Sequence, residues 1–124
     1  NEYLAYPPDI TVGEALDRFK RDAPEIEHVY YVYVVKEEKL LGVVGLRELI
    51  LESPAEPLAS VMHKKLITVP ADANQETVAE LISKYNLVAL PVVDDENCLL
   101  GIVTVDDVVD LLLPPAARRK RRKM

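Results

Sequence analysis

Several features that would point to common functions are scarce or missing in this sequence. There is one cysteine, so no internal disulfide can form, which fits a reducing compartment. No run of about 18 apolar residues is present, so no segment is expected to span a bilayer. A membrane protein from which this piece was cut is not excluded, and the start at Asn1 rather than Met fits a fragment.

Catalytic signatures are also missing. The sequence holds no glycine-rich phosphate loop ending in Gly-Lys, no cysteine–histidine metal cluster and no nucleophile elbow. His28 and His63 are isolated and lack the spacing of paired metal ligands. Nothing in the pattern brings a nucleophile together with a base. We therefore expect a protein that is not an enzyme.

The charge is unevenly distributed. The net charge is −6, but six of the 15 basic residues lie in the segment Arg118–Lys123. The first 117 residues hold the other nine basic residues against 21 acidic ones, a net charge of −12. Such an acidic body repels nucleic acid and attracts divalent cations or a basic partner. We expect the tail 114–124 to be disordered.

The central feature of the chain is an internal repeat. The segment Leu40–Ile50 returns 59 residues later as Leu99–Val109, and 9–16 is echoed more weakly by 72–79. A repeat of this length corresponds to a whole supersecondary unit. It predicts two similar halves around a pseudo-twofold axis, with a cleft between them.

Local patterns assign elements to each half. Thr11 with Glu14, and Asn74, are expected to begin helices. Further helices are expected from 46 and from 105, and strands at 29–35, 40–44, 66–69, 89–93 and 99–103. Each half therefore reads β-α-β-β-α, giving an α/β fold of two units packed sheet to sheet. The expected bounds are 1–56 for the first unit and 57–113 for the second.

One candidate site lies where the last strand meets the last helix. Thr104 places a hydroxyl at the strand end, and Asp107 places a carboxylate in the first helical turn. Free N–H groups at a helix N-terminus suit phosphate, and a carboxylate can accept from ribose hydroxyls. The alternative is that Thr104 and Asp107 only cap their helix. The first copy has Gly45 and Glu48 at these positions and is the weaker candidate.

Acidic residues gather in two other places. Asp94, Asp95 and Glu96 fall in one turn, and Asp106, Asp107 and Asp110 in the last helix. Hard oxygen ligands suit Mg²⁺, which keeps most of its water and takes one or two carboxylates directly. Such a site can be half-made in one chain and completed by another chain or domain. The alternative is that these carboxylates are simply solvated.

These residues bear a family resemblance. Leu90–Asp94 followed by Leu99–Val108 resembles the signature of CBS domains, whose tandem pairs form Bateman modules. Ala23-Pro24-Glu25, the run Tyr30–Val35 and Leu46–Ile50 resemble the CBS pair of MgtE-type magnesium transporters. The resemblance implies a homodimeric regulatory domain at the cytoplasmic face of the membrane. It would bind Mg²⁺, gate the transmembrane pore domain of the parent protein, and in some members bind ATP or AMP. The basic segment Arg118–Lys123 would then contact an anionic membrane surface.

The resemblance also implies site residues. For an adenine nucleotide, Thr104 and Asp107 would bind ribose and phosphate, and the adenine side would be lined by Thr68, Val69, Pro70, Leu90 and Pro91. For Mg²⁺ the implied ligands are Asp94, Glu96 and Asp106. Two other functions stay open. One is a CBS module that regulates a soluble enzyme through AMP, ATP or S-adenosylmethionine, and the other is an interaction module without a small ligand.

Overall fold

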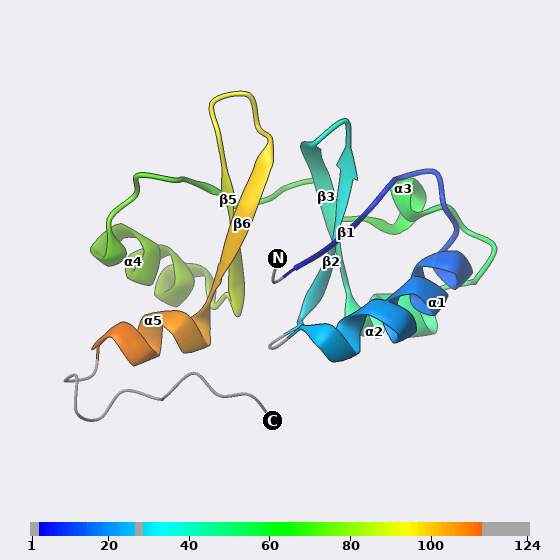
Figure 1. The fold of residues 1–124 in the computed structure, drawn as a ribbon, viewed down its shortest axis with the longest axis horizontal. Helices are drawn as coiled ribbons and strands as arrows, with labels where there is room; N and C mark the ends of the chain where they lie inside the picture. The colour runs from blue at the N-terminus through cyan, green and yellow to red at the C-terminus, as the bar shows by residue number, and fades with distance from the viewer. Residues whose placement is uncertain (1–2, 27–28, 113–124) are drawn as a thin grey trace.

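The computed structural model describes residues 3–26 and 29–112, and it shows the repeat as two similar halves (Figure 1). The first half contains β1 (Leu4–Tyr6), α1 (Val12–Asp22), the 3₁₀ turn η1 (Ala23–Glu25), β2 (Tyr31–Lys36), β3 (Lys39–Gly45) and α2 (Leu46–Leu51). A short helix, α3 (Leu58–Val61), leads to the second half. That half contains β4 (Val69–Pro70), α4 (Gln75–Tyr85), β5 (Ala89–Val93), β6 (Leu99–Thr104) and α5 (Val105–Leu112).

Each half forms a three-stranded sheet with the same topology. The strand orders are β1-β2-β3 and β4-β5-β6, and in each sheet the first pair is parallel and the second antiparallel. Both hairpins carry a register shift at matching places, between Val34 and Val35 and between Val92 and Val93. The predicted β-α-β-β-α order is therefore confirmed in both halves.

The two sheets face each other, and the helices cover their outer faces (Figure 1). Between the sheets, Tyr33 and Leu40 of the first half pack with Val93 of the second, and all three are buried. Each half also has its own cluster between sheet and helices. No helix within residues 3–26 and 29–112 is both long and apolar enough to cross a bilayer.

The tips of the two hairpins hydrogen-bond to each other. The N–H of Leu40 donates to the carbonyl of Asn97 at 2.9 Å, and the Asn97 side chain donates back to the carbonyl of Leu40 at 2.8 Å. The N–H of Leu99 donates to the carbonyl of Glu38 at 3.0 Å. Asn97 holds a left-handed backbone with φ of 67°. Because the contacts join residues 57 to 61 positions apart, they fix the two halves to one another.

Most local predictions hold, and two do not. Thr11 and Glu14 form the predicted capping box of α1, and Asn74 caps α4. The predicted strand at 66–69 is wrong over 66–68, because only Val69 and Pro70 pair with β5. Helix α3 was not predicted, since its four residues are too few to show a helical period. The expected tail at 114–124 and His28 lie outside the described residues.

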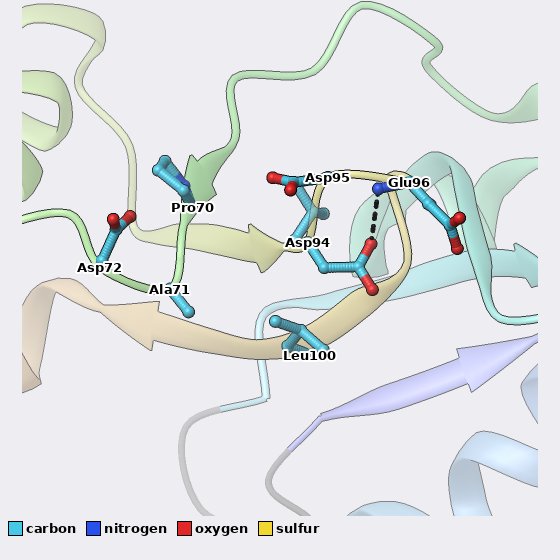
Figure 2. Close-up of a pocket in the computed structure, with 8 residues that line it drawn as sticks. Pro70, Ala71, Asp72, Asp94, Asp95, Glu96 and Leu100 are labelled. Atoms are coloured by element: carbon cyan, nitrogen blue, oxygen red, sulfur yellow. Dashed lines mark hydrogen bonds between the residues drawn. The ribbon is translucent and has the colours of Figure 1, made fainter.

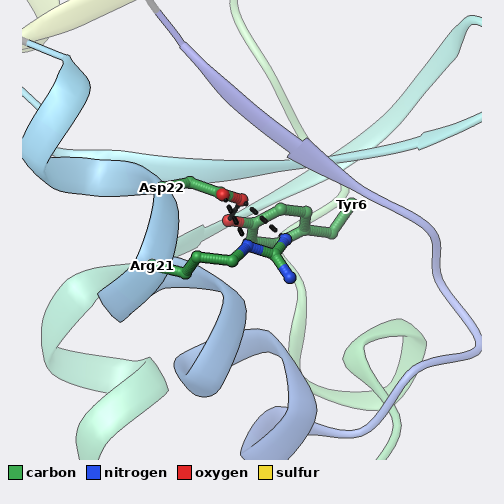
Figure 3. A network of polar contacts seen from close by, with 3 residues as sticks. All are labelled: Tyr6, Arg21 and Asp22. Carbon is green, nitrogen blue, oxygen red and sulfur yellow. Dashed lines mark hydrogen bonds and ion pairs between the residues drawn. The ribbon is translucent and has the colours of Figure 1, made fainter.

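A polar network ties β1 to the end of α1 in the first half. The buried Tyr6 hydroxyl donates to Asp22 Oδ2 at 2.8 Å, and Arg21 donates to the same carboxylate (Figure 3). Burial and the Asp22 carboxylate raise the pKa of Tyr6 above its ordinary range. The phenol therefore stays neutral and acts as a donor that holds α1 against the sheet.

Two equivalent glycines differ in what covers them. Gly42 of β3 and Gly101 of β6 oppose Val34 and Val92, which hold the same place in the two sheets. A Cβ on Gly42 would lie 2.8 Å from the carbonyl oxygen of His63 and 2.8 Å from Met62 Sδ. A Cβ on Gly101 would have no atom within 4 Å. Among the residues that the structure describes, a segment lies over this point in the first half and none does in the second.

We predict that Gly42→Ala destabilises the protein and that Gly101→Ala does not. Overpacking against the His63 backbone should cost about 1–3 kcal/mol of unfolding free energy. At the open Gly101 position the change should stay within about 0.5 kcal/mol. Urea unfolding followed by circular dichroism measures both variants. Equal losses at the two glycines would contradict this account.

We also predict that the Asn97 side chain stabilises the contact between the halves. Asn97→Gly keeps the left-handed backbone accessible but removes the bond to Leu40, and should cost about 1 kcal/mol. Asn86→Gly is the matched control, because Asn86 is also left-handed, with φ of 54°, at the end of α4. The two variants are compared by their midpoints of denaturant unfolding. An equal loss of stability in both would show that the side-chain bond from Asn97 to Leu40 adds no stability.

Candidate functional site

The pair Thr104 and Asp107 stands at the junction of β6 and α5. The N–H of Asp107 donates to Thr104 Oγ1 at 3.2 Å, and the N–H of Thr104 donates to Asp107 Oδ2 at 3.2 Å. Thr104 is 5% exposed. This is a capping box, so the capping alternative is present in the structure. The same two bonds hold the Thr104 hydroxyl and the Asp107 carboxylate at the N-terminus of α5. Groups at this place can bind the phosphate and ribose of a nucleotide.

The first half uses the equivalent positions differently. The N–H of Gly45 donates to Glu48 Oε1 at 2.8 Å, and the other Glu48 oxygen contacts His63 Nε2. Burial raises the pKa of Glu48, but the hydrogen bonds from His63 and Gly45 outweigh it and leave the pKa below its ordinary value. Glu48 is thus engaged by its own helix and by the segment between the halves.

The residues expected to line the adenine side of a nucleotide site lie on the neighbouring strands β4 and β5 or next to them, but they differ in burial and in where their side chains point. Val69 and Leu90 are 2% and 0% exposed within the cluster under α4 and α5, so their side chains face the helices. Any contact of these two residues with a ligand between the two halves would therefore be made by their backbone. Pro91 is buried next to Leu90 in β5, Thr68 is half-buried just before β4, and Pro70 is exposed.

Asp106 joins the two halves. The hydroxyl of Tyr30, which precedes β2, donates to Asp106 Oδ2 at 2.7 Å. The two residues are 76 positions apart, so no local pattern could have shown this contact. An expected magnesium ligand is therefore already an acceptor in a contact between the halves.

Asp94 organises the turn between β5 and β6. Its Oδ1 accepts from the N–H of Glu96 at 2.9 Å (Figure 2). The same oxygen accepts from the N–H of Cys98, also at 2.9 Å. The bond from Cys98 above all, with that from Glu96, outweighs the opposing effect of desolvation and holds the pKa of Asp94 below its ordinary value. Lys39 of the first half donates to the carbonyl oxygen of Glu96 at 2.9 Å. The turn thus keeps an ionised carboxylate beside a cation from the other half.

An acidic pocket of about 480 Å³ lies beside this turn. Asp94, Asp95 and Glu96 line it together with Asp72, which follows β4 (Figure 2). Sequence reasoning missed Asp72 as a member, because it is joined to the turn only through the β4–β5 pairing. Among residues 3–26 and 29–112, no three acidic, histidine or cysteine side chains come close enough to hold a metal ion together.

The three expected magnesium ligands do not meet within one chain. Asp94 and Glu96 lie at one end of β6 and Asp106 at the other, beyond a strand of six residues. At about 3.3 Å per residue, that separation is on the order of 20 Å. The three residues therefore do not form one site within a single chain, and the expectation that another chain or domain completes the site stays a prediction.

Comparison with known proteins identifies the scaffold. Residues 2–54 and 58–114 each match the sequence profile of the CBS domain. The magnesium transporter MgtE of Thermus thermophilus is 47% identical over 112 residues, covering 90% of this chain and 25% of that protein. MgtE of Bacillus subtilis is 41% identical over 117 residues, covering 94% and 26%. The inosine-5'-monophosphate dehydrogenase of Methanocaldococcus jannaschii is 32% identical and covers 99% and 24%.

Solved structures agree. The cytosolic domain of the Mg²⁺ channel MgtE in complex with ATP superposes with a TM-score of 0.85 at 47% identity, covering 89% of this chain and 45% of that one. The soluble part of a magnesium transporter gives 0.86 at 39%, covering 90% and 44%. The chain spans about a quarter of the length of its curated relatives. It belongs to the CBS-domain family, as a tandem pair that resembles the cytosolic CBS domain of MgtE-type magnesium transporters.

Proposed function

We propose that this chain is the regulatory CBS pair of a magnesium transporter, at the cytoplasmic face of the membrane. The observation that carries the proposal is its 47% identity with MgtE of Thermus thermophilus over nearly the whole chain. In this role it senses Mg²⁺ and gates ion transport through rearrangement of a dimer. The transmembrane pore domain of the parent protein is the partner that responds, and the chain itself has no catalytic task.

Magnesium acts through carboxylates that one chain cannot bring together. Asp94 and Glu96 supply oxygens at the hairpin tip, and Asp106 supplies one at the N-terminus of α5. Mg²⁺ keeps several waters and needs only one or two direct carboxylates, so each group can form half of a site. A second chain or another domain completes it. Because the first 117 residues carry a net charge of −12, bound cations favour the compact arrangement over the loose one.

An adenine nucleotide, ATP or AMP, is the proposed second ligand. One related MgtE domain is described in complex with ATP, and one related CBS pair with 5'-methylthioadenosine and S-adenosyl-L-methionine. Thr104 and Asp107 are the residues proposed to bind it, with the backbone of β4 and β5 on the adenine side. Their capping box fixes both side chains before a ligand arrives, which reduces the entropy lost on binding.

The alternative is a CBS module that regulates a soluble enzyme. It is favoured by the 32% identity with an inosine-5'-monophosphate dehydrogenase across 99% of this chain. In that case the nucleotide site would matter and the acidic turn would not. Binding of a nucleotide without any response to Mg²⁺ would favour this alternative. A module without a small ligand would respond to neither.

The magnesium proposal predicts a specific thermal shift. Millimolar Mg²⁺ should raise the unfolding midpoint of the chain, and Asp94→Asn and Asp106→Asn should each reduce that shift. Asp95→Asn is the matched control, because it removes the same charge from the same turn without removing a proposed ligand. Scanning fluorimetry with Mg²⁺, and with K⁺ at equal ionic strength, measures the shift. A shift unchanged by the two ligand variants would remove Asp94 and Asp106 from the site.

The nucleotide proposal predicts a loss of ATP affinity in one half only. Asp107→Asn keeps an oxygen that can cap α5 but loses the negative charge, and should weaken ATP binding at least about tenfold. Glu48→Gln makes the matched change in the first half and should leave the affinity unchanged. Isothermal titration calorimetry measures both. An Asp107→Asn protein that binds ATP like the parent chain would place the nucleotide elsewhere.

A further inference from the structure

The apolar cluster of the first half is closed by α3. Leu58 is 0% exposed and belongs to the same cluster as Ile10, Val12, Val44 and Leu49, whose exposed fractions are 9%, 1%, 0% and 1%. The segment is also bound through its backbone. The N–H of Leu58 donates to the carbonyl of Ile10 at 2.8 Å, and the N–H of Val12 donates to the carbonyl of Glu56 at 2.7 Å.

The same segment then extends the sheet of the first half. His63 forms a bridge with Val43 of β3, through N–H···O bonds of 2.8 and 3.0 Å in the two directions. Strand β3 is an edge of its sheet, so this bridge covers backbone groups that would otherwise face solvent. Leu58 in the apolar cluster and His63 on the edge of β3 together hold the segment against the first half.

Within residues 3–26 and 29–112, no segment covers the equivalent surface of the second half. Tyr6 opposes Val34 and Val69 opposes Val92, so the first strands of the two halves stand 63 residues apart. Gly42 and Gly101 oppose the same two valines from the third strands, which stand 59 residues apart. The positions around Leu58 then correspond to five residues of the second half. Those five line an open pocket of about 410 Å³ and are Ala73, Gln75, Val78, Val103 and Val108.

The backbone groups that bind α3 also have equivalents in the second half. They are the carbonyl of Ala73, the N–H of Gln75 and the outer edge of β6 at Ile102. Within the described part of the chain, no segment from outside the second sheet and its helices bonds to them. Gly101 beside them has no atom within 4 Å of a Cβ position. We call this surface the β6 groove: Ala73, Gln75, Val78, Gly101, Ile102, Val103 and Val108.

We propose that the β6 groove binds a short helical segment with the chemistry of Pro57–His63, supplied by the protein from outside these 124 residues. Its leucine-sized side chain fills the pocket between α4 and α5, and a residue five positions on pairs antiparallel with Ile102. The rim carries Glu76 and Glu80, which favours a segment without acidic residues. The proposal rests on the chain being part of a longer protein, and not on magnesium as the ligand.

Other occupants fit the groove less well. Residues 116–122, which stand 59 positions after Pro57–His63, read Ala-Ala-Arg-Arg-Lys-Arg-Arg and offer no large apolar side chain. A second copy of the chain cannot offer its own α3, because Leu58 is buried in its first half. A docked segment would touch Val103 and Val108, which adjoin Thr104 and Asp107 in sequence. It would therefore connect the rest of the protein to the proposed nucleotide site.

The test uses the isotope-labelled 124-residue chain and a capped peptide with the sequence of residues 57–65. We expect saturable shifts of the backbone amide signals of Gly101, Ile102, Val103 and Val108. A peptide carrying Leu58→Asp should bind at least about tenfold more weakly. In the chain, Gly101→Val should abolish binding by filling the groove. Leu100→Val is the matched control, because Leu100 lines the acidic pocket instead and should leave binding unchanged.

Four outcomes would overturn the proposal. The first is no shift at any residue up to about 2 mM peptide. The second is a shift centred on Gly42–Val44, because the peptide would then replace α3 itself. The third is movement of the groove signals on deletion of residues 116–124 without peptide, which would make the tail the occupant. The fourth is movement of the groove signals when only the protein concentration is raised, which would make a second copy of the chain the occupant. None of these depends on the response to Mg²⁺.

Discussion

The structure depends on the packing of one sheet against the other. Each half covers only one face of its three-stranded sheet with helices, and a sheet this small needs cover on its second face. Tyr33, Leu40 and Val93 supply that cover from both halves and are 2%, 4% and 8% exposed. The bonded hairpin tips then fix how the halves are aligned. The contact of Tyr30 with Asp106, and the place of Lys39 beside the acidic turn, follow from this alignment.

Local signals in the sequence were sufficient for most of the fold. Capping residues such as Thr11 and Asn74, and hairpins of β-branched residues, act over a few positions and could be recognised directly. The errors concern elements that exist only through distant contacts. Strand β4 has two residues because its length is set by pairing with Val92 and Val93. Helix α3 has four residues because Leu58 is held by the first-half core rather than by helical propensity.

The candidate site shows the same division between local and distant information. The sequence places Thr104 and Asp107 correctly, since a capping box spans four residues, and it identifies the acidic turn. It cannot show that Asp106 accepts from Tyr30, or that Asp72 joins the pocket of Asp94, because both contacts need the folded sheets. The family resemblance implied Asp94, Glu96 and Asp106 as one set of ligands, and the length of β6 separates Asp106 from the other two. The proposed magnesium site therefore needs a second chain or another domain to complete it.

The two halves differ most in what covers them. Glycine is a weak strand former, and at Gly42 the His63 backbone and the Met62 side chain leave room for nothing larger. Gly101 is an equally weak strand former, but no described residue lies close enough to exclude a larger side chain there. Val78 and Val108 keep exposed fractions of 7% and 9% where Ala15 and Leu49 of the first half have 0% and 1%. An unfilled core and an uncovered glycine at the same surface are both explained if a further segment lies there, as α3 lies on the first half.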